Sequence, residues 1–215
     1  MKIDVFQDPA CPWCRIGKRH LQLALEQWHG EPVEVHYRGF MLNPSIPAEG
    51  QEFRPYMQAK GGGRIPLEQF FAAPRQMGSA VGLVFNFDQI ERAPNMLLAQ
   101  RLVAITPTEQ RGALLDAIYA AYFEHGRDIG DIETLVEIAA AHGMDPAAAR
   151  EQLAGDAGRI EVLADLRWAQ EAGIGGVPFF VFDERYAVSG AQPPDVLLQV
   201  MEQVAAGTIA EPDAV

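Results

Sequence analysis

The two cysteines of the chain form one Cys11-Pro12-Trp13-Cys14 motif at the junction of a predicted strand and a predicted helix. Alternating apolar residues from Lys2 to Phe6 predict the strand. Pro12 suits the first turn of a helix, where a missing N–H costs nothing. A cysteine there faces unpaired N–H groups and the positive end of the helix dipole, which favour its reactive thiolate form. The fold must therefore lead a strand directly into a helix N-terminus.

The first 40 residues predict a strand, a helix and a second strand. The helix should run from about Cys11 to Trp28 and end at Gly30, because glycine commonly follows the last helical turn. Val33–Phe40 alternates apolar and polar side chains, which predicts the second strand. Two strands joined by one helix pair in parallel, so this part of the chain predicts an α/β fold.

The middle of the chain predicts a loop and then helices. Residues 42–63 are loop-like, with several prolines and glycines. The pattern from about Pro66 to Ala172 is helical, and Asp131 and Asp145 are expected N-cap residues.

The last part of the chain predicts a hairpin and a helix. Pro178–Phe182 and Tyr186–Ser189 are strand-like and are separated by three polar residues. Pro194–Ala206 predicts a final helix, and Thr208–Val215 a frayed tail. Because hairpin strands run antiparallel, a sheet built from both ends of the chain is mixed, and the central helices form an insertion.

Charge and apolar content limit the partners and the location. The chain has 215 residues and a net charge of -12, which argues against a nucleic-acid partner. No apolar run approaches the roughly 20 residues of a membrane helix, so we expect no membrane partner. The first residues lack the basic and apolar pattern of a signal peptide. We therefore expect a cytoplasmic protein; the oligomeric state stays open.

The cysteine pair allows three interpretations: redox catalysis, metal binding, or two small buried residues. In redox catalysis, Cys11 should be the more exposed, attacking thiol and Cys14 the resolving thiol, while Arg15 and Lys18 add positive charge nearby. A structural zinc site needs four ligands. The sequence has no second cysteine pair and no histidines at zinc-binding spacing, so we expect no metal.

A second motif, Gly175-Gly176-Val177-Pro178, precedes the predicted apolar strand. Proline cannot donate to a sheet ladder, so it belongs at the start of a strand. Peptide bonds before proline are the only ones that are commonly cis. A cis bond at Pro178 would turn the Val177 backbone outward, where it could pair with an extended substrate. An ordinary trans proline is the alternative.

Four segments of the chain match those of a known family. They are Asp8–Lys18, Leu42–Pro44, Ala172–Phe180 and Tyr186–Gln192. In combination they resemble thioredoxin-fold oxidoreductases and, more narrowly, the DsbA-like FrnE family. The resemblance extends from about residue 2 to residue 206.

The resemblance implies an α/β thioredoxin fold interrupted by a large helical insertion. Residues 1–43 and 170–207 would form the thioredoxin-like domain, residues 44–169 the inserted helical domain, and residues 208–215 a C-terminal tail. It also implies a catalytic nucleophile, a resolving thiol and a cis proline packed against them. These are Cys11, Cys14 and Pro178, with Pro12, Trp13 and Val177 expected to contact the substrate.

The activity implied is exchange of disulfides with protein or small thiol substrates. We expect no bound cofactor, with glutathione as a candidate redox partner. Relatives of the family include kappa-class glutathione transferases and 2-hydroxychromene-2-carboxylate isomerases. Glutathione-dependent isomerisation or transfer on small aromatic compounds is therefore the alternative.

A non-enzymatic alternative is a redox-sensing or chaperone-like module. Its client-binding residues would be apolar side chains of the helical insertion, although large apolar residues are mostly buried. These residues are Phe70, Phe71, Met77, Phe85 and Phe87.

Overall fold

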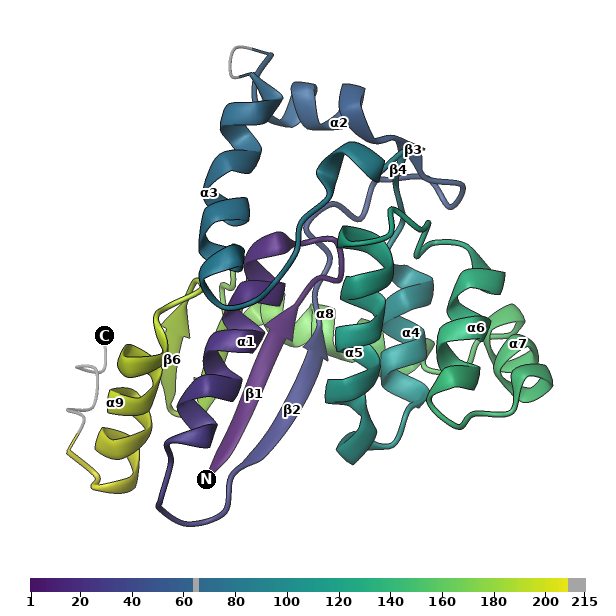
Figure 1. The fold of residues 1–215 in the computed structure, drawn as a ribbon. Helices are drawn as coiled ribbons and strands as arrows, with labels where there is room; N and C mark the ends of the chain where they lie inside the picture. The colour runs from purple at the N-terminus through teal and green to yellow at the C-terminus, as the bar shows by residue number, and fades with distance from the viewer. Residues whose placement is uncertain (64–65, 209–215) are drawn as a thin grey trace.

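The computed structural model describes residues 1–63 and 66–208 (Figure 1). Its main sheet has four strands in the order β2-β1-β5-β6. They are β1 (Lys2–Gln7), β2 (Glu34–Gly39), β5 (Phe179–Phe182) and β6 (Tyr186–Ser189). β1 pairs in parallel with β2 and antiparallel with β5, and β6 pairs antiparallel with β5. The expected mixed sheet, built from both ends of the chain, is confirmed.

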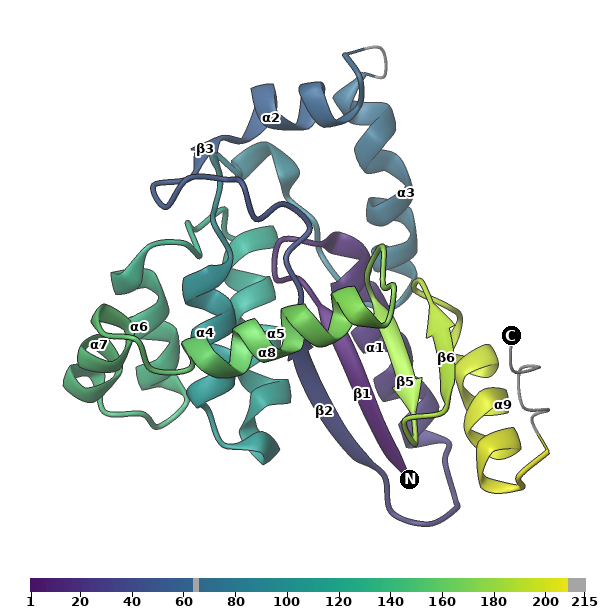
Figure 2. The same ribbon diagram turned by 180° about the vertical axis from the view of Figure 1, so that it is seen from behind.

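Helices cover both faces of this sheet. α1 (Pro12–Glu26) and α9 (Pro194–Ala205) pack together on one face, and α8 (Arg159–Glu171) crosses the other, as Figures 1 and 2 show. β1 is buried from both sides. Ile3 and Val5 belong to a core cluster with α1 and α9, and Phe6 packs with Ala169 of α8. The central strand that leads into the cysteine motif is thereby held in place.

The remaining elements lie beside the sheet and beyond one of its ends. They are β3 (Gln51–Glu52), α2 (Phe53–Lys60), α3 (Leu67–Ala80), the short 3-10 helix η1 (Phe87–Gln89), β4 (Arg92–Ala93), α4 (Leu97–Ile105), α5 (Thr108–Phe123), α6 (Ile132–Ala141) and α7 (Pro146–Ala154). α4 and α5 contact β2, and α6 and α7 lie farther out. α2 and α3 extend from the end of the sheet where β1 leads into α1 (Figure 1).

Several local predictions are confirmed. The carboxylate of Asp131 accepts a hydrogen bond from the Thr134 backbone N–H, and Asp145 accepts one from Ala148, so both aspartates are N-caps. The hairpin and the final helix lie where the sequence predicted them. Of the predicted tail, residues 209–215 lie outside the described residues. The division into two domains stays a prediction.

Three local predictions are wrong. Residues 51–60, expected in a loop, form β3 and α2; only Phe53 of α2 is buried, so the helical periodicity is weak. Residues 81–96, expected to be helical, contain η1 and β4. The first helix ends at Glu26 and not at Trp28, whose indole N–H donates to the Glu31 carbonyl at 2.8 Å in the following turn.

No helix in the described part of the chain is long and apolar enough to cross a membrane.

Candidate active site

Cys11 is the N-cap residue of α1. Its backbone is extended, with φ -94° and ψ 113°, and Pro12 follows in the first turn. Its side chain makes no capping hydrogen bond, and the first turn of α1 contains no acidic residue. Cys11 therefore lies at the positive end of the helix dipole, and the first turn of α1 places no carboxylate beside it.

Both cysteines are buried, and neither is in a disulfide. Cys11 is 4% exposed and Cys14 is 1% exposed, so Cys11 is the less buried of the two, as expected. Burial, the hydrogen bond with the Cys11 side chain and the charge of Cys11 raise the pKa of the Cys14 thiol well above its usual value. Cys14 therefore holds its proton next to Cys11.

The second motif meets the first in space. The Cys11 sulfur lies 3.7 Å from the carbonyl oxygen of Val177, and the Val177–Pro178 peptide bond is cis. Pro178 is buried and directly precedes β5. Gly17 of α1 lies against its ring, because a β-carbon on Gly17 would be 2.7 Å from Pro178 Cγ. Residues from two distant parts of the chain thus form one site.

The structure corrects the expected role of Arg15 and Lys18. The Arg15 guanidinium donates to the Val84 carbonyl at 2.7 Å and forms an ion pair with Glu124. The Lys18 ammonium, which is 1% exposed, pairs with Asp116 at 2.6 Å. Both charges are neutralised by carboxylates of the helical insertion. The two ion pairs join α1 to that insertion. The partial positive charge of the α1 N-terminus still acts on Cys11.

Asp8 is a site residue that the sequence analysis did not single out. Its side chain is buried, and its two carboxylate oxygens accept hydrogen bonds from the backbone N–H groups of Ala10 and Leu42, both at 2.8 Å. Burial raises the pKa of Asp8 to about 6, although these hydrogen bonds oppose the shift. A carboxylate three residues before the first cysteine was the available signal, but its burial depends on the loop that carries Leu42.

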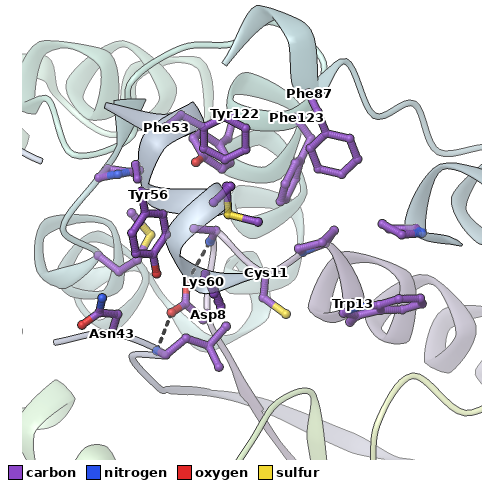
Figure 3. A pocket seen from close by; sticks show the side chains of 18 of the residues that line it. Asp8, Cys11, Trp13, Asn43, Phe53, Tyr56, Lys60, Phe87, Tyr122 and Phe123 are labelled. Atoms are coloured by element: carbon purple, nitrogen blue, oxygen red, sulfur yellow. Dashed lines mark hydrogen bonds between the residues drawn. The ribbon is translucent and has the colours of Figure 1, made fainter. Parts of the chain in front are cut away.

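A cavity of about 430 Å³ opens beside Cys11 (Figure 3). Its walls come from the motif loop, from α2 and α3, from the end of α5, and from Gly176 and Val177. They are mainly apolar and include Pro12, Trp13, Phe53, Met57, Phe70, Phe71, Phe87, Met96, Tyr122, Phe123 and Val177. The side chains of Asp8, Asn43, Tyr56 and Lys60 add the polar groups. All three expected substrate contacts, Pro12, Trp13 and Val177, therefore border one cavity.

Stacked aromatic rings support the far wall of this cavity. The Phe71 ring stacks on Phe87 with a centroid distance of 4.3 Å and on Phe53 at 5.8 Å. Phe71, Phe85 and Phe87 are buried, whereas Phe70 and Met77 are 37% and 36% exposed. Most of the side chains considered for client binding are thus part of the core or of the cavity wall.

Two histidines have hydrogen bonds to backbone carbonyls, which indicates a structural role. His20 Nδ1 lies 2.7 Å from the Gln192 carbonyl oxygen, and His142 Nδ1 lies 2.9 Å from that of Ile138. The described part of the chain contains no group of three or more histidine, cysteine, aspartate or glutamate side chains that could hold a metal ion.

A model of the DSBA-like thioredoxin domain matches residues 2–202. The chain belongs to this family. A member from Streptomyces coelicolor, whose solved structure is described as a probable DsbA oxidoreductase, is 35% identical with a TM-score of 0.84, and the match covers 100% of this chain and 94% of that one. The FrnE subfamily stays a prediction.

Two further proteins are similar to this DSBA-like chain. The uncharacterized protein YwbO of Bacillus subtilis is 26% identical over 198 residues, covering 90% of this chain and 92% of YwbO. The cytosolic disulfide reductase DsbM from Pseudomonas aeruginosa, solved with GSH, is 22% identical with a TM-score of 0.65 and covers 96% of this chain and 100% of DsbM. At that identity DsbM shows a shared fold.

Proposed function

We propose that the protein is a thiol–disulfide oxidoreductase that works through the Cys11–Cys14 dithiol. One observation carries the proposal: the Cys11 sulfur lies at the N-terminus of α1, 3.7 Å from the Val177 carbonyl and at the edge of an open cavity. A substrate sulfur can approach Cys11 from this cavity, while Cys14 lies deeper in the protein. The same arrangement gives the two thiols different roles.

In the reducing direction, the Cys11 thiolate attacks a substrate disulfide. A Cys11–substrate disulfide forms and the first substrate thiolate leaves. Cys14 then loses its proton and attacks Cys11, which releases the second substrate thiol and leaves the Cys11–Cys14 disulfide. Two electrons pass from the dithiol to the substrate. The oxidising direction is the reverse, with a substrate dithiol as the electron donor.

The raised pKa of Cys14 fits the resolving role. A resolving thiol that kept its thiolate at all times would compete with Cys11 for the substrate, whereas a protonated thiol is a poor nucleophile. Burial is the first cause of this raised pKa, and the charge on Cys11 is a further one that is lost when the mixed disulfide forms. A protonated and deeply placed Cys14 therefore fits the second attack of the sequence.

Protein thiols or glutathione are the proposed partners, and the cytoplasm is the proposed location. DsbM, a cytosolic reductase solved with GSH, supports both assignments by its shared fold. Pro178 is the third proposed catalytic residue. It precedes β5 and fixes the Val177 carbonyl beside Cys11.

Insulin reduction tests the proposal. Wild-type protein should accelerate the reduction of insulin by dithiothreitol, Cys11→Ser should be inactive, and Cys14→Ser should accumulate a mixed disulfide visible by mass spectrometry. Wild-type activity no greater than that of Cys11→Ser would refute the proposal. Glutathione-dependent turnover of a small aromatic compound that survives Cys14→Ser would instead support the isomerase or transferase alternative.

A further inference from the structure

The cavity beside Cys11 is lined mainly by apolar side chains. Its outer wall consists of α2 and α3, which extend from the end of the sheet over the cysteine motif (Figure 1). Met57 of α2 and Phe70 and Phe71 of α3 face the cavity. Its volume of about 430 Å³ is within the range of about 300–1,000 Å³ typical of small-molecule sites.

The polar groups of the cavity are few, and one of them is already satisfied. Both oxygens of Asp8 accept backbone hydrogen bonds. Lys60 is exposed, and its ammonium lies 5.9 Å from the centroid of the Tyr56 ring. The positive charge is thus at the rim, and the described residues that line the cavity include no second cation.

This distribution disfavours glutathione disulfide as the best substrate. Each half of that molecule carries two carboxylates and one ammonium, and burying such groups without partners is costly. An aromatic group, in contrast, would bury its apolar surface against Met57, Phe70 and Phe71. A single carboxylate on the aromatic group could remain near Lys60.

We propose that the cavity binds the aromatic body of a low-molecular-weight disulfide and directs exchange at Cys11 toward aromatic disulfides. The inference rests on the proposed exchange activity and specifies its substrate class. The aromatic group lies against α2 and α3, which places the attached sulfur at the Cys11 end of the cavity. A carboxylate on the ring makes its ion pair with Lys60.

Reduction of the aryl disulfide takes two steps. Reduced Cys11 attacks the aryl disulfide, so that one aryl thiolate leaves and a Cys11–S–S–aryl bond forms. Cys14 attacks Cys11, gives up its proton and releases the second aryl thiol. The two electrons come from the dithiol, and an external dithiol such as dithiothreitol reduces the Cys11–Cys14 disulfide for the next turnover.

Exchange rates with three disulfides test this selectivity. The probes are 4,4′-dithiodibenzoic acid, glutathione disulfide and insulin, each normalised to its rate with a small reference thiol, because aryl thiolates are intrinsically better leaving groups. Wild-type protein should prefer the aromatic disulfide by about tenfold or more, as expected for burial of one ring. An equal or higher normalised rate with glutathione disulfide or insulin would overturn the inference.

Substitution of two methionines, one inside the cavity and one outside it, tests whether the cavity wall causes the preference for the aromatic disulfide. Met57 lines the cavity, whereas Met77 is exposed on α3 and does not line it. Met57→Gln keeps the side-chain length but adds a polar amide to the wall, and should lower the aromatic preference about fivefold or more. Met77→Gln should leave it within about twofold, since exposed substitutions have small effects. Equal effects of the two variants would contradict the assignment.

Binding of a redox-inert analogue separates this inference from the proposed activity. Bis(4-carboxyphenyl) sulfide has the shape of the aromatic substrate but no S–S bond, and its affinity can be measured by calorimetry. It should bind wild type and Met77→Gln equally and Met57→Gln at least about fivefold more weakly. Absence of binding would overturn the inference and leave the exchange activity standing. Binding without any disulfide exchange would refute the exchange activity, and with it the substrate class.

Discussion

Gly17 and Pro178 are in direct contact across the interface between α1 and the loop before β5. A β-carbon on Gly17 would lie 2.7 Å from Pro178 Cγ and 3.3 Å from Phe180 Cζ. Both neighbours are rigid rings in the core, so they cannot yield by a simple rotation. The absence of a side chain at Gly17 is what allows α1 to approach the loop that holds the Val177 carbonyl next to Cys11.

Gly17→Ala should therefore destabilise the protein and slow exchange. Alanine favours a helix by about 1 kcal/mol over glycine, but overpacking typically costs about 1–3 kcal/mol, so we expect a net loss. Displacing Pro178 should also move Val177 from Cys11 and lower the exchange rate. Urea unfolding and insulin reduction measure the two effects.

Gly112→Ala is the control for that substitution. Gly112 is also inside a helix, α5, but its β-carbon would meet the Tyr37 ring at 3.3 Å. It should change stability by less than about 1 kcal/mol and leave exchange unaffected. Equal losses in both variants would show that the contact with Pro178 has no special importance.

The two cysteines should differ in their reaction with an alkylating reagent. Cys14 is 1% exposed and its pKa is raised well above the usual value, so it stays a protonated thiol at pH 8. Iodoacetamide should therefore label the reduced native protein once, at Cys11, and label both cysteines after denaturation. Peptide mapping by mass spectrometry would locate the label. Native Cys11→Ser should resist labelling; two labels on the native wild type would contradict this prediction.

Asp8 should make stability depend on pH. Its pKa rises from 3.8 to about 6 on folding, so between these values the folded protein binds a proton that the unfolded chain has lost. The free energy of unfolding consequently falls as pH rises through this interval and levels off above it. At about 1.4 kcal/mol per pKa unit, the shift corresponds to about 3 kcal/mol.

Asp8→Asn removes this titration. The amide keeps one oxygen that can accept from the backbone N–H of Ala10 or Leu42. Relative to wild type, the variant should therefore gain up to about 3 kcal/mol in unfolding free energy between pH 4 and pH 8. Chemical denaturation at several pH values gives this difference. A difference that is constant with pH would contradict it.

The ion pair of Lys18 and Asp116 should contribute more to stability than exposed pairs do. The Lys18 side chain is 1% exposed, whereas that of Asp116 is 50% exposed. Burial already lowers the pKa of Lys18, and Asp116→Asn would remove the charge that opposes this shift. Breaking a fully buried pair costs about 3–5 kcal/mol; solvent at Asp116 reduces our expectation to about 2 kcal/mol.

Asp156→Asn provides the comparison. Asp156 pairs with Arg159 at 3.3 Å, and both side chains are more than half exposed. Its loss should cost no more than about 0.5 kcal/mol. Thermal unfolding of the two variants would show the contrast, and similar costs would mean that burial of Lys18 has no energetic consequence.

Local sequence patterns were sufficient to predict the strands of the sheet and the position of the cysteine pair at the start of a helix. The alternation in β1 and β5 and the N-cap residues Asp131 and Asp145 depend on neighbours in the sequence. α2 was missed because its eight residues bury only Phe53, so no apolar stripe marks it.

The parts of the site that depend on distant contacts could not be predicted. Asp8 is buried because the loop with Leu42 covers it, and sequence spacing does not reveal this contact. Their sequence positions place Arg15 and Lys18 near Cys11, but they do not reveal the ion pairs with Glu124 and Asp116. The cavity likewise exists only because α2 and α3 extend over the motif.

The contact between Cys11 and Val177 spans 166 positions of the chain. A ribosome therefore releases the cysteine pair long before it releases the loop and the strand β5 that complete the site. Until then β1 can pair with β2 but lacks its other neighbour in the sheet. The nascent chain therefore carries both thiols for the time that the ribosome needs to add the residues between Cys14 and Val177, before the Val177 carbonyl can take its place beside Cys11.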